Sequence, residues 1–285
     1  MNTKGVSKIF DKKYFLLLLL VLFISKILNY FYLIKLKILS KFNDKKSIEI
    51  TGVSRSGSSL FEYILSKRID AICVGEIHYK YLNDTGLGKF DYHYRSKKIE
   101  EFYSSIILTK DNFLNYILRF TNKDIIISSS KNYEYLKRRK KEKNLNNLNL
   151  IIVKNPTLQI KSYPENLSSL DKTDEYLFSA FQKYFMILLF SLISLTPFII
   201  IRYEDLFTDK KREMIFKKLS YYLNAQIKNF DFVNQFYLPI NGSKTFNLNK
   251  PIIFDEKKDI VLNEDILKRI NNNLHTKFIN LIRYF

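Results

Sequence analysis

The stretch that most constrains the fold of this chain is IEITGVSRSGSSLFEYIL, residues 48–65. Its first residues alternate in hydrophobicity and predict a β-strand, and the apolar spacing at its end predicts an amphipathic helix. Between them lies a loop bounded by Gly52 and Gly57. This order directs backbone N–H groups and the positive end of a helix dipole at one spot, which favours binding of a phosphate or a sulfate there.

The loop differs from the nucleotide-binding P-loop in the position of its cation. The two glycines have the P-loop spacing, but Ser58 stands where that motif requires lysine, and the cation is Arg55, inside the loop. Ser58 and Ser59 are expected in the first helical turn, where their hydroxyls can cap the helix and donate to phosphate oxygens. The alternative is a Gly/Ser-rich turn that only caps a helix, because short glycine motifs have many false matches.

The segment GVSRSGSSL resembles the 5′-phosphosulfate loop of the sulfotransferases that use 3′-phosphoadenylyl sulfate (PAPS). Its Arg-Ser-Gly-Ser-Ser string has the form common in bacterial and Golgi-type members. The resemblance implies that the loop binds the 5′-phosphosulfate of PAPS and that the arginine stabilises the leaving bridging oxygen. The residues that it assigns to the cofactor here are Arg55, Ser56, Gly57, Ser58 and Ser59.

A second segment of the family follows the predicted strand at residues 148–153. Sulfotransferases have Arg-Asn/Asp-Pro after this strand and a serine eight residues beyond the arginine, and these two residues hold the 3′-phosphate. Lys154 and Ser162 keep that spacing, and the resemblance assigns them this role. Lysine keeps the charge but loses the bidentate fork of arginine. A strand-end lysine before a proline turn is otherwise ordinary.

The candidate catalytic base follows a short predicted strand at residues 71–74. A Gly-Glu pair at this place often supplies the base in the family, which implies Glu76 in this chain. His78 is the alternative base, because imidazole titrates in the right range. The other possibility is that Glu76 is an ordinary surface glutamate after a strand.

Three further segments resemble the family to different degrees. After the predicted strand 124–127, SSSK is similar to the family's Asp-Ser-Ser-Lys, with Ser128 in place of the aspartate, and implies that Lys131 lies beside the cofactor. After the predicted strand 198–201, RYEDL is similar to a late marker of sulfotransferase domains with a structural role. A looser match near the C-terminus makes Lys244 a candidate for a loop that closes over the nucleotide.

The order of these elements predicts the fold class. Apolar strands that alternate with helices indicate a three-layer α/β/α domain with a central, mainly parallel sheet and a P-loop-like nucleotide-binding loop. The 285 residues suffice for one such domain, expected at 47–285, and an N-terminal segment, 1–46.

The N-terminal segment is expected to associate with a membrane. Residues 14–24 are an uninterrupted apolar run between lysine-rich flanks. Extended to residue 34, the run is long enough to span a bilayer, with Lys26 and Asn29 inside the span. A helix that lies in the interface with its lysines on lipid phosphates fits equally well, and a buried packing helix is the third possibility. Because both flanks are basic, charge does not choose an orientation.

The amino-acid composition indicates which kinds of ligand and binding partner the protein is expected to have. The balance of 47 Lys+Arg against 28 Asp+Glu gives +19, which favours an anionic cofactor, an acidic substrate or an anionic membrane surface, unless it is only a compositional bias of the solvated surface. The single cysteine, Cys73, excludes an internal disulfide and a cysteine-based zinc site, and the scattered histidines give no metal-ligand pattern, so no metal is expected. The chain has no nucleic-acid recognition motif.

The resemblance therefore predicts transfer of the sulfuryl group of PAPS to a hydroxyl or amine, leaving adenosine 3′,5′-bisphosphate (PAP). The acceptor is expected to be a carbohydrate or a glycolipid. A bacterial source would put the domain in the cytoplasm, where bacteria make PAPS, and a eukaryotic source in the Golgi lumen. The alternatives are a P-loop kinase or NTPase, which needs the missing lysine and a strand-end aspartate for Mg²⁺, and a non-catalytic, membrane-associated anion-binding protein.

Overall fold

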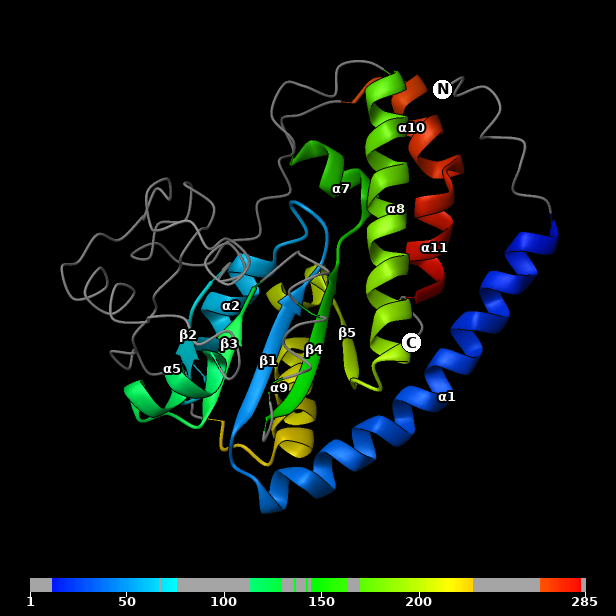
Figure 1. The fold of residues 1–285 in the computed structure, drawn as a ribbon. Helices are drawn as coiled ribbons and strands as arrows, with labels where there is room; N and C mark the ends of the chain where they lie inside the picture. The colour runs from blue at the N-terminus through cyan, green and yellow to red at the C-terminus, as the bar shows by residue number, and fades with distance from the viewer. Residues whose placement is uncertain are drawn as a thin grey trace.

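The computed structural model describes residues 12–66, 68–75, 113–129, 136, 142, 145–162, 170–227 and 262–282. In this part of the chain, five strands form one all-parallel sheet in the order β2-β3-β1-β4-β5 (Figure 1). The strands are β1 (Lys46–Thr51), β2 (Ile72–Cys73), β3 (Ile125–Ser128), β4 (Asn146–Val153) and β5 (Phe198–Arg202). The predicted α/β class and the parallel sheet are thus confirmed.

The described helices alternate with these strands. They are α1 (Lys12–Phe42), α2 (Ser58–Ser66), α5 (Phe113–Thr121), α7 (Pro156–Lys161), α8 (Leu170–Ile193), α9 (Asp209–Leu223), α10 (Glu264–Asn272) and α11 (Leu274–Ile282). A short 3₁₀ helix, η2 (Tyr203–Phe207), links β5 to α9. Two of the described helices, α1 and α8, are long and apolar enough to cross a membrane.

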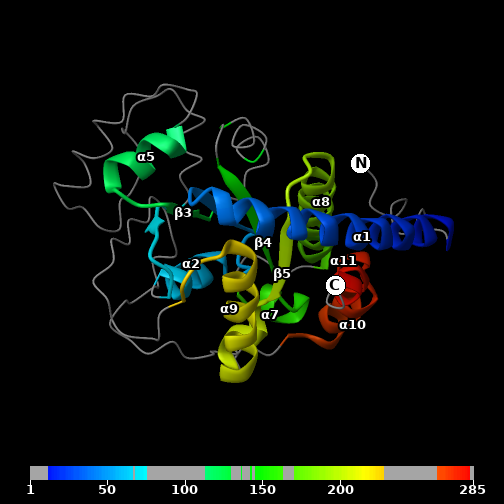
Figure 2. The same cartoon turned by 90° about the horizontal axis from the view of Figure 1, so that it is seen from below.

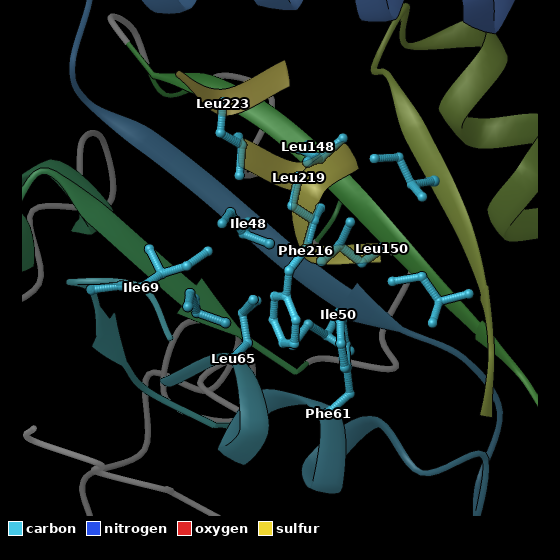
Figure 3. Close-up of a cluster of buried hydrophobic side chains, with 14 of the residues drawn as sticks. Ile48, Ile50, Phe61, Leu65, Ile69, Leu148, Leu150, Phe216, Leu219 and Leu223 are labelled. Carbon is cyan, nitrogen blue, oxygen red and sulfur yellow. The ribbon is translucent and has the colours of Figure 1, made fainter. Parts of the chain in front are cut away.

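One face of the sheet packs against α2 and α9. Because successive side chains of a strand point to opposite faces, Ile48 and Ile50 of β1 share this face with Leu148 and Leu150 of β4. Phe61 of α2 and Phe216 of α9 are fully buried against them. Figure 3 shows these side chains, with the two helices contributing to one apolar cluster. This cluster holds the start of α2, and with it the glycine-bounded loop, against the central strand.

Other apolar residues of β4 and β5 pack against α8 and α11. Ile151 and Val153 of β4 form a second cluster with Phe198 of β5, and Phe181 and Phe278 supply edge-to-face aromatic packing from the two helices. The apolar second half of α8 is therefore largely accounted for by packing within the domain.

Helix α1 packs on the same domain. Leu22 joins the cluster of α8 and α11, and Leu33 and Leu36 join the cluster of α2 and α9. Asn29 makes two hydrogen bonds with the backbone of Phe198, because its Nδ2 donates to the carbonyl and its Oδ1 accepts from the N–H, both at 2.8 Å. Figure 2 shows α1 crossing the domain in the view from below. Asn29, the polar residue in the apolar run, thus pairs with the first residue of edge strand β5. The predicted boundary between an N-terminal segment, 1–46, and a domain, 47–285, stays a prediction.

His275 on α11 is a buried, neutral imidazole. Its ring stacks on Tyr184 of α8, with centroids 5.8 Å apart and an interplanar angle of 11°. Neither of its ring nitrogens has a hydrogen-bond partner among the described residues. Burial lowers the pKa of His275 from 6.5 to about 3, because the charged imidazolium would lose its hydration.

This histidine should make the protein sensitive to acid. Above pH 6.5 the imidazole is neutral in both the folded and the unfolded chain; below it, only the unfolded chain takes up the proton until the pH nears 3. The free energy of unfolding should therefore fall by about 1.4 kcal/mol per pH unit across this window. Denaturant titrations above and below pH 6.5 measure the slope. His275→Phe, which keeps the aromatic stack, should remove this part of it; an unchanged slope would contradict the assignment.

Candidate functional site

The sheet order identifies one edge as the place for a ligand. Neighbouring strands β1 and β4 send the chain in opposite directions, because β1 leads through α2 toward β2 whereas β4 leads through α7 and α8 toward β5 (Figure 1). In parallel α/β sheets, ligands bind at the carboxyl ends of the strands at such a switch point. The segments that leave β1 and β4 at this edge are residues 52–57 and 154–162.

The loop after β1 turns sharply and ends at the first residue of α2. Arg55 and Gly57 have positive φ angles of 63° and 94°, and the N–H of Ser56 donates to the carbonyl of Val53 at 3.1 Å. Helix α2 begins at Ser58, so Ser58 and Ser59 lie in its first turn, as predicted. Left-handed residues beside a helix start bring backbone N–H groups into a concave arrangement that suits an anion. The side chain of Arg55 is exposed at this turn.

Ser56 supplies a buried hydroxyl to the loop. Its Oγ is fully buried and has no hydrogen-bond partner within the described part of the chain. A Cβ on Gly52 would lie 2.5 Å from this Oγ and 2.9 Å from the carbonyl oxygen of Ile152, so only glycine fits between the loop and β4. Since an unpaired buried hydroxyl is unfavourable, the Oγ is a polar group that a ligand oxygen could satisfy.

The loop after β4 brings Lys154 and Ser162 together. Lys154 Nζ donates to Ser162 Oγ at 2.7 Å, and Ser162 Oγ donates to the carbonyl of Leu158 at 2.7 Å. The short helix α7 makes this contact possible, because Asn155 caps its start and Ser162 its end. The eight-residue spacing that the sequence singled out therefore covers the six residues of α7 and its two caps, so that Ser162 at the end of α7 meets Lys154 at the end of β4.

Two hydrogen bonds tie the loop after β1 to helices α7 and α8. Gln159 Nε2 on α7 and the hydroxyl of Tyr176 on α8 both donate to the carbonyl of Ser54, each at 3.0 Å. The residue whose carbonyl they hold precedes Arg55 directly. The orientation of the arginine turn is thus set by α7 and α8, and neither Gln159 nor Tyr176 carried a signal in the sequence.

The segment after β5 contacts both loops. A Cβ on Gly57 would lie 2.2 Å from Cδ2 of Tyr203, so the ring closes directly on the glycine. Lys154 Nζ lies 4.4 Å from the centroid of the same ring, a distance typical of a cation–π contact. Glu204 Oε1 accepts from the N–H of Asn155 at 2.7 Å. The sequence predicted only a structural role for this segment. The one feature that could have indicated a place for Tyr203 in the site is its position at the carboxyl end of a strand.

On the other side of β1, the chain is held where it leaves β2. Glu62 Oε1 on α2 accepts from the N–H of Gly75 at 2.7 Å, and the carbonyl of Gly75 accepts from the N–H of Ser129 at 2.9 Å. These bonds fix the starting point of the segment that carries the candidate base. The candidates Glu76, His78, Lys131 and Lys244 themselves lie outside the described residues.

Ser128, which stands where the resembled segment has an aspartate, has a buried structural partner. Its hydroxyl donates to the side-chain carboxylate of Glu49, the residue opposite it on β1. Both residues are buried. An aspartate at position 128 would place a second carboxylate against Glu49, and two buried carboxylates repel each other unless one is protonated.

Comparison with known proteins adds no relative: no protein-family model matches the chain, and no curated protein matches it significantly. The class of the protein therefore rests on its own geometry. It is an α/β protein with a parallel sheet that gathers an arginine turn, two serines of a first helical turn and a lysine–serine pair at one edge.

Proposed function

We propose that this protein is a PAPS-dependent sulfotransferase that acts on a hydroxyl or amine of a carbohydrate or a lipid-linked glycan. The observation that carries the proposal is the meeting of three segments that the resemblance had singled out separately. Tyr203, at the end of β5, contacts both Gly57 of the loop and Lys154 of the lysine–serine pair, although Gly57 and Tyr203 are 146 residues apart in the chain. We further propose the three-layer α/β/α arrangement and a P-loop-like role for the loop, supported by the apolar clusters on both sheet faces.

The proposed roles follow from charge and position. Lys154 and Ser162 bind the 3′-phosphate, whose oxygens replace or share their mutual hydrogen bond. Ser58, Ser59 and the N–H groups of the loop bind the 5′-phosphate at the start of α2. Arg55 lies at the turn between these groups, where its guanidinium neutralises charge on the bridging oxygen as the bond to sulfur breaks.

The reaction needs no covalent enzyme intermediate. The acceptor oxygen attacks sulfur in line with the bridging oxygen, a new S–O bond forms, and PAP leaves with the electron pair of the old one. The acceptor proton passes to Glu76 or, in the alternative, to His78. As in phosphoryl transfer, the protein contributes mainly positioning and charge stabilisation.

The competing functions use the same edge differently. A P-loop kinase or NTPase needs a lysine directly after the second glycine, where this chain has Ser58, and a strand-end carboxylate for Mg²⁺. The residues that directly follow β3 and β4 are Ser129 and Lys154. A non-catalytic anion-binding protein would keep the loop but need not bind PAP.

Calorimetric titration of the full-length protein with PAP, and in parallel with ATP and Mg²⁺, tests the proposal. The full chain is used because α1 packs on the domain. We expect PAP to bind, and Lys154→Ala to weaken it by about 10- to 100-fold, because a charge-assisted hydrogen bond to phosphate is lost. Lys183→Ala, at an exposed lysine of α8 outside the two site segments, is the matched control. Binding of ATP with Mg²⁺ alone would indicate a kinase or NTPase, and binding of neither nucleotide would refute both enzymes.

A further inference from the structure

Helix α1 has one buried side and one exposed apolar side. The buried positions are Leu22, Ser25, Leu33, Leu36 and Ser40. The exposed apolar positions recur every three or four residues and therefore lie in one line along the helix. They are Leu20, Ile24, Ile27, Phe31, Ile34 and Ile38. Phe42 extends this line and is 83% exposed.

The exposed apolar line is accompanied by positive charge. Lys26, Lys35 and Lys41 are exposed on the same helix, and the sequence of α1 contains no acidic residue. Further apolar side chains, among them Phe23 and Tyr30, widen the line into a band. An apolar band with lysines along it is complementary to an anionic bilayer, since the side chains enter the headgroup region while the ammonium groups pair with lipid phosphates.

A second apolar segment lies beside α1 at the turn between α8 and β5. Ile193 and Leu195 are 71% and 58% exposed. They are close to α1 because Phe198, three residues further on, is hydrogen-bonded to Asn29. The exposed apolar turn is therefore a second apolar surface feature close to α1.

Leu195 occupies a backbone position that glycine normally fills. Its φ is 54°, its N–H donates to the carbonyl of Leu192, and the N–H of Thr196 donates to that of Ser191. This pattern is the Schellman ending of a helix, in which the left-handed residue is usually glycine. A leucine there is strained, and because it is 58% exposed it gains little stabilisation from burial within the monomer.

We propose that α1 lies on the surface of an anionic bilayer without leaving the domain, and that the Leu195 turn inserts beside it. The sequence left three possibilities for this helix: that it spans the membrane, that it lies in the interface, or that it is buried in the domain. This proposal selects the interfacial helix. A spanning α1 would have to give up the packing of Leu33 and Leu36 and both hydrogen bonds between Asn29 and Phe198. An interfacial helix keeps all of these contacts and buries the band.

This attachment determines which way the sheet edge with the candidate site faces. Asn29 contacts the first residue of β5, and α1 ends just before β1 begins, so the C-terminal half of the helix lies at the amino ends of the strands. The loops of the candidate site lie at the carboxyl ends, roughly 20 Å away for strands of this length. If the proposed function holds, the acceptor group is presented from solution or stands well above the lipid headgroups. The membrane contact itself does not depend on that function.

A second copy of the chain is the competing occupant of the band. Apolar residues at alternating steps of three and four also suit helix pairing. The bilayer is favoured because the band is broader than a two-helix seam and because lysines on one helix meet no acidic residue on an identical partner helix.

Flotation of the full-length protein with vesicles tests the proposal. We expect binding to phosphatidylcholine vesicles that contain phosphatidylglycerol, much weaker binding to phosphatidylcholine alone, and release by high salt or alkaline carbonate. Leu195→Gly removes the side chain and suits the positive φ, so it should weaken binding about tenfold without lowering the melting temperature. Met214→Ser, at an exposed apolar residue of α9, is the control that should change nothing.

Three outcomes would overturn the proposal. Retention on the vesicles after carbonate extraction would indicate a spanning helix. A concentration-dependent dimer that does not bind vesicles would indicate a second copy on the band. Wild-type vesicle binding by Leu195→Gly would remove the turn from the contact surface. None of these assays uses PAP, so this proposal and the proposed enzyme activity can fail independently of each other.

Discussion

Replacing Arg55 with alanine should lower sulfuryl transfer by about 10²- to 10³-fold and leave the fold intact. The loss is large because the guanidinium is the group assigned to the charge that develops on the bridging oxygen, and removal of one such stabilising group costs a factor of this size. The fold should survive because the side chain is exposed. Alanine also meets the positive φ of 63° with the same strain that arginine already carries.

The measurement is the rate of PAP release from PAPS in the presence of a carbohydrate acceptor, together with the melting temperature. Arg55→Lys should retain part of the rate, because it keeps the charge and loses the planar fork. Arg119→Ala, at an exposed arginine of α5, should behave as wild type. Near-normal turnover in Arg55→Ala would show that the loop does not stabilise the reacting group.

Replacing Gly57 with alanine should damage both stability and cofactor binding. Two separate effects combine here. The φ of 94° is a conformation that residues with a side chain rarely adopt, and the new Cβ would lie 2.2 Å from the ring of Tyr203. Backbone strain and overpacking each cost about 1–3 kcal/mol, so we expect a loss of about 2–6 kcal/mol in the free energy of unfolding.

Relief of this clash by movement of Tyr203 would also disturb Lys154, which lies against the same ring. PAP affinity should therefore fall together with stability in Gly57→Ala, as denaturant titration and calorimetry would show. Adding Tyr203→Ala should recover part of the stability, because it removes the clash but not the strain of the positive φ. A Gly57→Ala protein with wild-type stability and PAP affinity would mean that the loop and Tyr203 are not packed as described.

Several features could be predicted because they depend on local sequence. The strands β3, β4 and β5 contain apolar runs that a parallel sheet buries, and they lie close to the predicted positions. Ser58 and Ser59 lie in the first turn of α2 because a glycine-bounded loop ends there. Lys154 and Ser162 meet because the eight-residue spacing matches a short capped helix.

Other features depend on contacts between residues far apart in the chain. No local sequence pattern indicates that the ring of Tyr203 packs on Gly57. Nor does one indicate that Gln159 and Tyr176 donate hydrogen bonds to the carbonyl of Ser54. The same holds for Asn29, which in the sequence is only a polar residue in an apolar run. Its partner is the backbone of Phe198, and only the docking of α1 on β5 brings the two together.

The sequence by itself determined the α/β class, the glycine-bounded loop between the first strand and its helix, and the apolar, lysine-flanked N-terminus. These follow from periodicity, from glycine spacing and from charge, which act over a few residues. The tertiary structure decided the strand order, and with it the switch point at which β1 and β4 bring their loops together. It also decided which side of α1 is buried, because packing against β5 and α9 divides an almost uniformly apolar helix into a docked face and an exposed one.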